Sequence, residues 1–494
     1  MKELAFDNEK YLRLQSEHIL KRISQFDNKL YLEFGGKLFD DHHAARVLPG
    51  FQPDSKLKML LTLKDKIEVV IVICANDIEK NKVRSDLGIT YDVEVLRLID
   101  AYRSVGLFVG SVVISQYNHQ ETVKSFIKHL HHLDVKTFIH YPIKGYPNNL
   151  PLIVSDEGFG KNDYIETTKP LVVITAPGPG SGKMATCLSQ LYHEHLHGVK
   201  AGYAKYETFP IWNLPLKHPV NLAYEAATAD LNDINMIDPF HLEAYGVTTV
   251  NYNRDVEIFP VLNTMFEKIF GSSPYKSPTD MGVNMAGNCI INNDRAEEAS
   301  RDEIIRRYYK AECDLKKGFI DESTIEKIQI VMSQANAVCE ARKCVKYAID
   351  KAVATDAPAM AIDLGDGRIV TGKTSPLLGC CAAAILNAIK VLANIDDNMP
   401  IISPNVIKPI QELKVNNLGN TNPRLHSDEV LIALAVSATT NPVSHQAMKQ
   451  LAKLTNCEAH STVILSEVDN TIFRKLKMNL TCEPEYQTKK LYHQ

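Results

Sequence analysis

The sequence predicts an α/β protein with a doubly wound, mostly parallel sheet in a large N-terminal part, a helical hairpin as connector, and a smaller C-terminal α/β subdomain. Continuous apolar runs at residues 68–74 and 171–175 are typical of strands covered on both faces. Amphipathic helical stretches alternate with such strands, and this alternation favours parallel βαβ units. A chain of 494 residues also exceeds one ordinary core, so several domains are expected.

The elements of the N-terminal part follow one another closely. Apolar residues at helical spacing predict a first helix at 7–26, and the alternating stretch 29–34 predicts the first strand. The following strands are predicted at 68–74, 107–114, 136–140 and 171–175, with helices at 93–102 and 121–132 between them. After residue 199 the pattern is less regular, with a strand-like stretch at 203–209, a helix at 221–231, a strand at 247–251 and a helix at 255–270.

Two long, charged, amphipathic stretches at 295–317 and 322–351 are separated by Gly318 and predict the helical hairpin. The second α/β unit comes after it, with strands at 359–364, 368–371 and 459–465 and helices at 377–393, 427–439, 444–454 and 469–476. The predicted domains are therefore an N-terminal part at 1–290, a helical connector at 291–350 and a C-terminal subdomain at 351–494.

Composition restricts the class of partner. Lys and Arg number 55 against 59 Asp and Glu, so the chain lacks the basic balance of a nucleic-acid-binding protein. No apolar run approaches the ~18 residues that span a bilayer, and no signal-peptide core is present, so no membrane partner is expected. The ten cysteines are scattered without a CxxC pair, which favours a reduced, cytoplasmic protein.

A Gly-rich loop follows the apolar run 171–175 and leads into a helix that begins at Lys183. A strand that is followed by a glycine-rich loop and a helix N-terminus presents free N–H groups and the positive end of the helix dipole to phosphate or carboxylate. The loop departs from a P-loop, because Pro177 replaces the first Gly and Met184 the magnesium-binding Ser or Thr. The alternative is a tight structural turn. The candidate ligand-binding residues are Gly178, Gly180, Ser181, Gly182 and Lys183.

A second stretch, residues 367–374, matches the P-loop expression at every fixed position. Its middle is β-branched and typical of a strand, and the glycines at 365 and 367 indicate a hairpin turn, so the match is interpreted as accidental. Lys373, Thr374 and Ser375 precede a helix and remain candidates for binding a second anion.

The helix from Lys183 ends in a formal H-e-x-x-H zinc motif formed by His193, Glu194 and His197. The stretch is rich in His, the helix is predicted to stop at Gly198, and only Glu207 suggests itself as a third ligand. Imidazoles that interact with the negative end of a helix dipole are the simpler interpretation. No metal site is therefore assigned, and a zinc hydrolase is the remote alternative.

The helix around 378–385 is rich in Gly, Cys and Ala, which allow a neighbouring backbone to approach closely. Packing on the second sheet, or a subunit contact, is the favoured interpretation. A nucleophilic Cys380 or Cys381 with a lowered pKa at the helix N-terminus is the alternative.

Polar residues that follow presumed strands are the candidates for catalysis, since α/β proteins place ligand groups at such positions. Asp238, His241 and Asp255 are selected as catalytic residues on this ground. A second cluster, His460 with Thr462, Asp469 and Arg474, occupies a comparable position in the C-terminal unit. Either cluster could equally be surface, or polar groups satisfied in the core.

Several long segments together resemble a known family: 29–43, 175–184, 205–215, 237–246 and 371–375. Over essentially its full length the chain is similar to the bacterial family catalogued as domain of unknown function 1846, also called uncharacterised protein family 0371. The resemblance implies a cytoplasmic α/β protein whose smaller C-terminal subdomain has a three-layer α/β/α, deaminase-like layout. The zinc signature of deaminases is missing, so that activity is not implied.

We therefore expect a protein that binds a phosphorylated or nucleotide-like small molecule at the Gly-rich loop and acts as a transferase or phosphotransferase. The cofactor, if any, would be a nucleotide or another phosphorylated compound, and the partner a small-molecule anion. The alternative is a non-catalytic, homo-oligomeric metabolite-binding or scaffold protein, with subunit contacts through the helices at 295–351 and the helix at 378–385.

Overall fold

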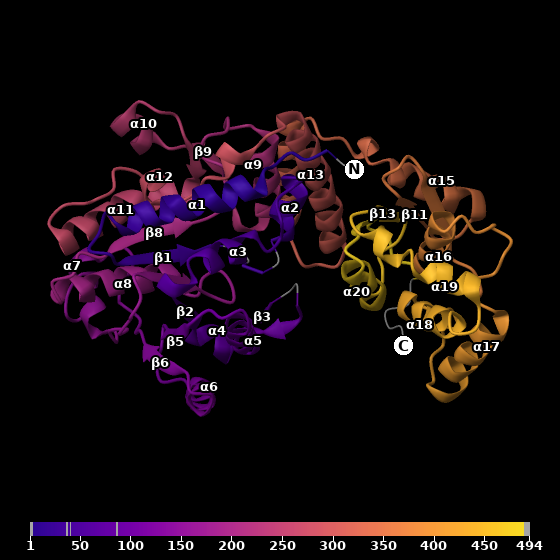
Figure 1. Cartoon of the computed structure of the whole chain (residues 1–494), viewed down its shortest axis with the longest axis horizontal. Helices are drawn as coiled ribbons and strands as arrows, with labels where there is room; N and C mark the ends of the chain where they lie inside the picture. Colours follow the sequence, from indigo (N-terminus) through magenta and orange to yellow (C-terminus); the bar gives the residue numbers. More distant parts are fainter. Residues whose placement is uncertain (1–2, 36–37, 40, 85–86, 489–494) are drawn as a thin grey trace. The chain divides into compact units, whose positions relative to one another are not determined.

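The continuous apolar runs of the sequence form the middle of a six-stranded sheet in the computed structural model of the chain (Figure 1). Ile67–Cys74 (β2), Leu171–Thr175 (β7) and Leu30–Phe34 (β1) are buried over their whole length. The other strands are Val109–Ser115 (β5), Lys136–Ile139 (β6) and Gly202–Tyr206 (β8). The strand order is β6-β5-β2-β7-β1-β8 and every pair is parallel, which confirms the predicted sheet.

Helices connect these strands in two directions along the sheet. The helices of this part are Asn8–Ile23 (α1), His42–Val47 (α2), Ser55–Thr62 (α3), Ala75–Glu79 (α4), Tyr91–Ser104 (α5), Glu121–His132 (α6), Leu150–Ile153 (α7) and Lys183–Leu196 (α8). From β1 the chain crosses β7 to reach β2, and from β7 it crosses β1 the other way to reach β8. The direction of the connections therefore reverses between the neighbouring strands β7 and β1. Because right-handed crossovers in opposite directions place their helices on opposite faces, the two connections leave towards opposite faces of the sheet. Ligands of open α/β sheets bind beyond the carboxyl ends of the strands at such a reversal.

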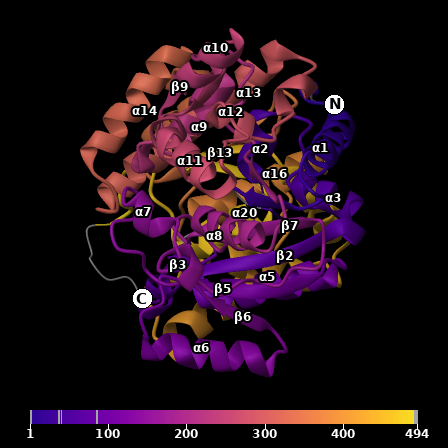
Figure 2. The same cartoon turned by 90° about the vertical axis from the view of Figure 1, so that its left-hand side faces the viewer.

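A further layer follows β8 (Figure 2). Its elements are Pro219–Ala227 (α9), Asn235–Ile237 (β9), Pro239–Tyr245 (α10), Val250–Tyr252 (β10), Asn253–Phe270 (α11) and Pro278–Met281 (α12). The predicted strand at 247–251 and helix at 255–270 correspond to β10 and α11. Gly282 pairs beside Lys205, so the segment after α12 extends the β8 edge of the sheet.

The stretch predicted as a helical hairpin contains three helices: Asn293–Lys316 (α13), Glu322–Ala335 (α14) and Lys343–Thr355 (α15). The prediction of one helix over 322–351 is wrong. Asn336 takes a left-handed backbone conformation with φ 52° and ends α14, and a 3-10 turn at Cys339–Ala341 precedes α15. Asn is one of the few residues other than Gly that adopt this conformation at a helix C-terminus.

A separate four-stranded sheet forms the centre of the C-terminal part. Ala359–Asp363 (β11) pairs antiparallel with Ile369–Lys373 (β12) and with Glu458–Ser461 (β13), and Asn479–Cys482 (β14) pairs parallel with β13. On one face Ala361 packs against Ala348 of α15, whereas on the other Met360 and Ile362 pack against Cys380–Leu392 (α16) and Ser427–Ser437 (α18). Pro404–Glu412 (α17), Pro442–Met448 (α19) and Glu467–Lys475 (α20) complete this part.

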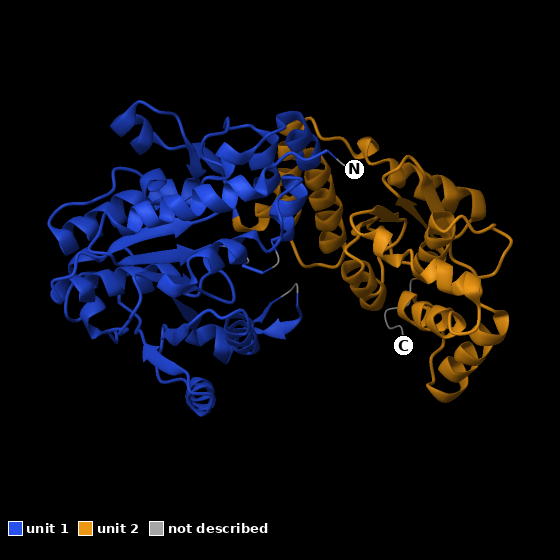
Figure 3. Ribbon diagram, viewed as in Figure 1, with its two compact units in different colours: residues 1–225, 232–300 blue, residues 226–231, 301–494 orange. Residues whose placement is uncertain are grey.

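The chain divides into two units, residues 1–225 with 232–300 (unit 1) and residues 226–231 with 301–494 (unit 2) (Figure 3). The structure describes residues 3–35, 38–39, 41–84 and 87–488. Gly36, Lys37 and Asp40, which belong to the distinctive segment 29–43, lie outside these ranges. None of the helices in the described ranges has the length and apolar character needed to cross a membrane.

Candidate functional site

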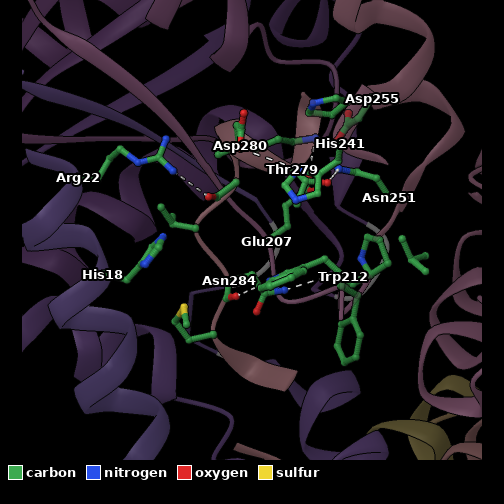
Figure 4. Close-up of a pocket in the computed structure, with 18 of the residues that line it drawn as sticks. His18, Arg22, Glu207, Trp212, His241, Asn251, Asp255, Thr279, Asp280 and Asn284 are labelled. Carbon is green, nitrogen blue, oxygen red and sulfur yellow. Dashed lines mark hydrogen bonds and ion pairs between the residues drawn. The ribbon is translucent and has the colours of Figure 1, made fainter. Parts of the chain in front are cut away.

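A cavity of about 410 Å³ lies in unit 1 at the edge of the parallel sheet where β8 ends (Figure 4). We call it the Trp212 cavity, because the single Trp of the chain lines it. Its volume lies within the range of roughly 300–1,000 Å³ that is usual for small-molecule sites. Its charged or titratable side chains are His18, Arg22, Lys205, Glu207, His241, Asp255 and Asp280.

Local structure explains how these side chains reach the cavity. His18 and Arg22 are one helical turn apart on α1 and therefore share a face. Lys205 and Glu207 are two residues apart at the end of β8, so they lie on the same side of the extended chain. Asp255 lies in the first turn of α11, and Asp280 belongs to α12.

Lys205 is the centre of a buried ion cluster. Its ammonium lies 2.5 Å from the Asp255 carboxylate and 3.2 Å from that of Glu207. Burial opposes the positive charge, but the two carboxylates outweigh burial and raise the pKa of Lys205. Lys205 is therefore charged at neutral pH.

Glu207 is the titratable group of this cluster at neutral pH. Burial raises the pKa of its carboxyl from 4.5 to about 7, with Asp255 and Glu33 acting in the same direction and Lys205 opposing. Its side chain is 27% exposed and lines the cavity, between Thr279 and Trp212 in the view of Figure 4. A carboxyl group with a pKa near 7 in a cavity can both accept and donate a proton, which general acid–base catalysis requires.

The remaining walls combine apolar and amide groups. Trp212 and Phe209 contribute aromatic surface, and the Trp212 indole is held by donation of its N–H to the Asn284 carbonyl at 2.8 Å. Asn251 also lines the cavity, beside Thr279. Such walls suit a small organic molecule with one flat apolar face and several polar groups.

Of the residues predicted to be catalytic, two line this cavity and one does not. His241 lies 2.8 Å from the Ser277 hydroxyl through its Nδ1, and Asp255 binds Lys205. Asp238 is fully buried, and its carboxylate accepts hydrogen bonds from the His241 N–H and from the N–H and hydroxyl of Thr279. Asp238 thereby caps α10 and joins it to α12.

The Gly-rich loop lies beyond the carboxyl end of β7, beside the reversal of the sheet connections. The Ser181 hydroxyl donates to the Gly178 carbonyl, and the Ser115 hydroxyl donates to the Ser181 carbonyl at 2.6 Å. Gly182 has a φ of 94°, which an L side chain rarely adopts, and α8 begins at Lys183. The predicted strand, loop and helix are confirmed. Ligand binding stays a prediction for Gly178, Gly180, Ser181, Gly182 and Lys183.

Residues 367–374, which match the P-loop expression, form no phosphate-binding loop, because most of them belong to strand β12. The β-branched residues of this stretch predicted that strand. Lys373 ends the strand and is exposed, whereas Thr374 is buried. The Ser375 hydroxyl accepts hydrogen bonds from the N–H groups of Leu377 and Leu378 before α16. These three residues belong to unit 2 and the Trp212 cavity to unit 1.

Close packing explains the small residues of α16. A Cβ atom on Gly372 of β12 would lie 2.2 Å from the backbone nitrogen of Ala384, so helix and strand approach each other too closely for a larger residue. Cys380 and Cys381 are buried in the same core. The predicted packing on the second sheet is confirmed.

The formal zinc motif on α8 gains no third ligand from the part of the chain that the structure describes. Among the residues with described positions, no group of three or more His, Cys, Asp or Glu could hold a metal ion. Glu194 accepts a hydrogen bond from the Tyr31 hydroxyl at 2.5 Å, and the His197 ring contacts the His193 carbonyl at 2.7 Å. Glu207, the suggested third ligand, lies in the Trp212 cavity instead.

Sequence reasoning did not identify the centre of the cavity. Glu207 was considered only for zinc, and Arg22, Lys205 and Trp212 were not proposed for any role. The signal that could have found them is the polar pair Lys205 and Glu207 immediately beyond a strand, within the distinctive stretch 205–215.

Comparisons with known proteins cover almost the whole chain. Residues 4–336 match the family model described as domain of unknown function DUF1846, N-terminal, and residues 340–492 match the model described as DUF1846, C-terminal. The chain is 59% identical over 492 residues to a UPF0371 protein of Streptococcus uberis and 58% identical over 492 residues to one of Streptococcus pyogenes serotype M5, with 100% of both chains covered in each case. These names assign no activity.

Proposed function

The chain belongs to the DUF1846 family, and we propose that it is an enzyme that acts on a small polar molecule bound in the Trp212 cavity. The observation that carries this proposal is the Glu207 carboxyl, which has a pKa of about 7 and lines a cavity of about 410 Å³. Carboxyl groups with this combination of titration and access are typical of catalytic acids and bases.

The roles of the charged residues follow from their contacts. Ionised Glu207 accepts a proton from a hydroxyl or amino group of the substrate, and the protonated form returns one to a leaving group. Lys205, held by Asp255 and Glu207, stabilises negative charge that develops beside it. Activation of a nucleophile in this way is the chemistry of group transfer, so a transferase is the reaction class we adopt.

The cavity walls favour a nucleotide-like substrate over a simple acid. Trp212 and Phe209 provide surface on which a flat ring can stack, and Asn251 provides amide groups for its polar edge. Both signs of charge line the cavity, Arg22 and Lys205 beside Glu207, Asp255 and Asp280, so the cavity suits a molecule of mixed polarity.

Trp212 is also the means of testing the proposal. Titration with nucleotides, sugar phosphates and coenzyme A derivatives should change the fluorescence of this single Trp, and the bound compound should be converted. Glu207→Gln should bind the same compound and lose its conversion, whereas Glu257→Gln, an exposed acidic residue on α11, should change neither. If no compound of these classes changes Trp212 fluorescence or the melting temperature, the proposal fails.

A non-catalytic metabolite-binding protein is the second candidate, favoured by the two ion pairs that engage Lys205. Ion-pair networks of this kind also serve structure alone. A compound that binds with micromolar or tighter affinity and is recovered unchanged would favour this candidate. This candidate is also expected to be a homo-oligomer, and light scattering with and without the compound would measure its oligomeric state.

A further inference from the structure

The first turn of α8 has backbone N–H groups that find no acceptor among the residues with described positions. Gly182 is the N-cap residue and no side chain caps this end, while the first hydrogen bond of the helix runs from the Thr186 N–H to the Gly182 carbonyl. The N–H groups of Lys183, Met184 and Ala185 precede that bond and so have no partner inside the helix. With 14 residues, α8 also has a substantial dipole whose positive end lies here.

An independent feature lies beside this turn. Thr186 is fully buried, and its hydroxyl has no hydrogen-bond partner among the residues that the structure describes. Thr186, Gly182 and Ala185 together line a second cavity of about 30 Å³. Burying a hydroxyl without a partner costs free energy, so a ligand group that satisfies it is favoured.

The other walls of this second cavity suit a negative group. Ser115 ends β5 and His140 directly follows β6, and none of the described residues that line the cavity is acidic. Burial lowers the pKa of His140 to about 4, so its ring is neutral at pH 7. A cation would find no opposite charge here, whereas an oxyanion would meet the α8 dipole.

We infer that the first turn of α8 and the Thr186 hydroxyl form an oxyanion site that takes the phosphate group of a small molecule. A space of about 30 Å³ has room for one or two atoms of the size of a water molecule. One phosphate oxygen therefore enters to meet Thr186, and the others remain outside over the N–H groups of the first turn. Lys183, the first residue of α8, adds positive charge.

This oxyanion site is separate from the Trp212 cavity, and the two share no lining residue. The loop that leads into α8 follows β7, whereas the Trp212 cavity lies at the end of β8, and only β1 separates these strands. With strands about 4.8 Å apart, the two strand ends are separated by roughly 10 Å. Either site can be occupied or disabled by itself.

The test uses inorganic phosphate and the full chain. Phosphate should raise the melting temperature of the wild type in a saturable manner, and isothermal titration should give its dissociation constant. Thr186→Val removes the hydroxyl and preserves the shape, so it should weaken phosphate binding about tenfold or more. Without phosphate, the same variant should melt at the wild-type temperature or about 2–4 °C higher, because an unpaired buried hydroxyl is gone.

Two further variants keep the result unambiguous. Thr186→Ser retains the hydroxyl and should retain phosphate binding, whereas Thr264→Val, the same change on α11, should leave it unaltered. Equal phosphate affinity in the wild type and Thr186→Val would overturn the inference, as would a wild type that phosphate does not stabilise.

The source of the phosphate and the independence of the two sites are tested in the same way. A sugar phosphate or nucleotide that displaces inorganic phosphate and binds more tightly identifies a phosphorylated substrate. If none of these compounds displaces inorganic phosphate, the ligand is the free ion. Glu207→Gln should bind phosphate as the wild type does, so loss of phosphate binding in this variant would contradict the separate site.

Discussion

Replacing Glu207 with Gln should change how the stability of unit 1 depends on pH. The Glu207 carboxyl titrates near 4.5 in an unfolded chain, and burial raises its pKa to about 7 in the folded protein. Below pH 4.5 the carboxyl is protonated in both the folded and the unfolded state, and the stability gained from the raised pKa of Glu207 is fully present. As the pH rises towards 7 the unfolded state releases the proton first, so that contribution is lost and then stays constant above pH 7.

The pKa difference sets the size of the effect. A change from 4.5 to about 7 corresponds to about 3 kcal/mol of unfolding free energy at 1.36 kcal/mol for each pH unit. Gln has no proton to exchange, so the variant avoids this loss. Relative to the wild type, Glu207→Gln should therefore gain about 3 kcal/mol of stability between pH 4 and pH 8.

Urea denaturation followed by Trp212 fluorescence measures this difference, because the single Trp reports on unit 1. The two proteins should be compared at several pH values between 4 and 8. Glu257→Gln removes an exposed carboxylate from α11 and serves as the control, with an expected profile parallel to that of the wild type. A stability difference between wild type and Glu207→Gln that is the same at pH 4 and pH 8 would refute the argument.

The remaining predictions concern unit 2. Arg342→Met should destabilise it by about 3–5 kcal/mol, because the buried Arg342 guanidinium donates to Glu458 and to the Ala459 and Asn479 carbonyls. Burial by itself would raise the pKa of Glu458, but Arg306 and Arg342 lower it on balance. The stability that ionised Glu458 contributes is therefore present above pH 4.5 and is lost as the pH falls. Urea denaturation followed by circular dichroism at pH 7 and pH 4 tests both statements, and a loss below about 1 kcal/mol at pH 7 would contradict the first. Gly372→Ala should cost about 1–3 kcal/mol in the same assay, since its Cβ would lie 2.2 Å from the Ala384 nitrogen; Gly379→Ala, where the nearest atom is 3.9 Å away, should cost less.

The parallel sheet could be predicted because its signal is local. Strands β2 and β7 are buried on both faces, and two-sided burial demands an uninterrupted apolar run, which is visible in the sequence alone. The Gly-rich loop was also predictable, since strand, glycines and helix start are adjacent in the chain. For the same reason the β-branched residues of 368–371 correctly outweighed a complete P-loop expression.

Breaks inside polar helical stretches were harder to predict. The residues from Glu322 to Lys351 keep amphipathic spacing on both sides of the break. The left-handed backbone of Asn336 ends α14, and a 3-10 turn at Cys339–Ala341 follows before α15 begins. Asn tolerates that conformation but also occurs within helices, so its presence does not determine the boundary.

The Trp212 cavity was decided by tertiary structure. His18, Glu207, Asp255 and Asp280 come from segments far apart in the sequence, and no spacing relates them until α1, β8, α11 and α12 pack together. The pKa of Glu207 depends on burial and on Asp255, Glu33 and Lys205, which are long-range properties. Hydrophobic periodicity reports which face of one element is buried, whereas a cavity and its titration depend on which elements meet. The sequence alone therefore determined the sheet, the Gly-rich loop and the family, and the folded chain decided which polar groups share a site.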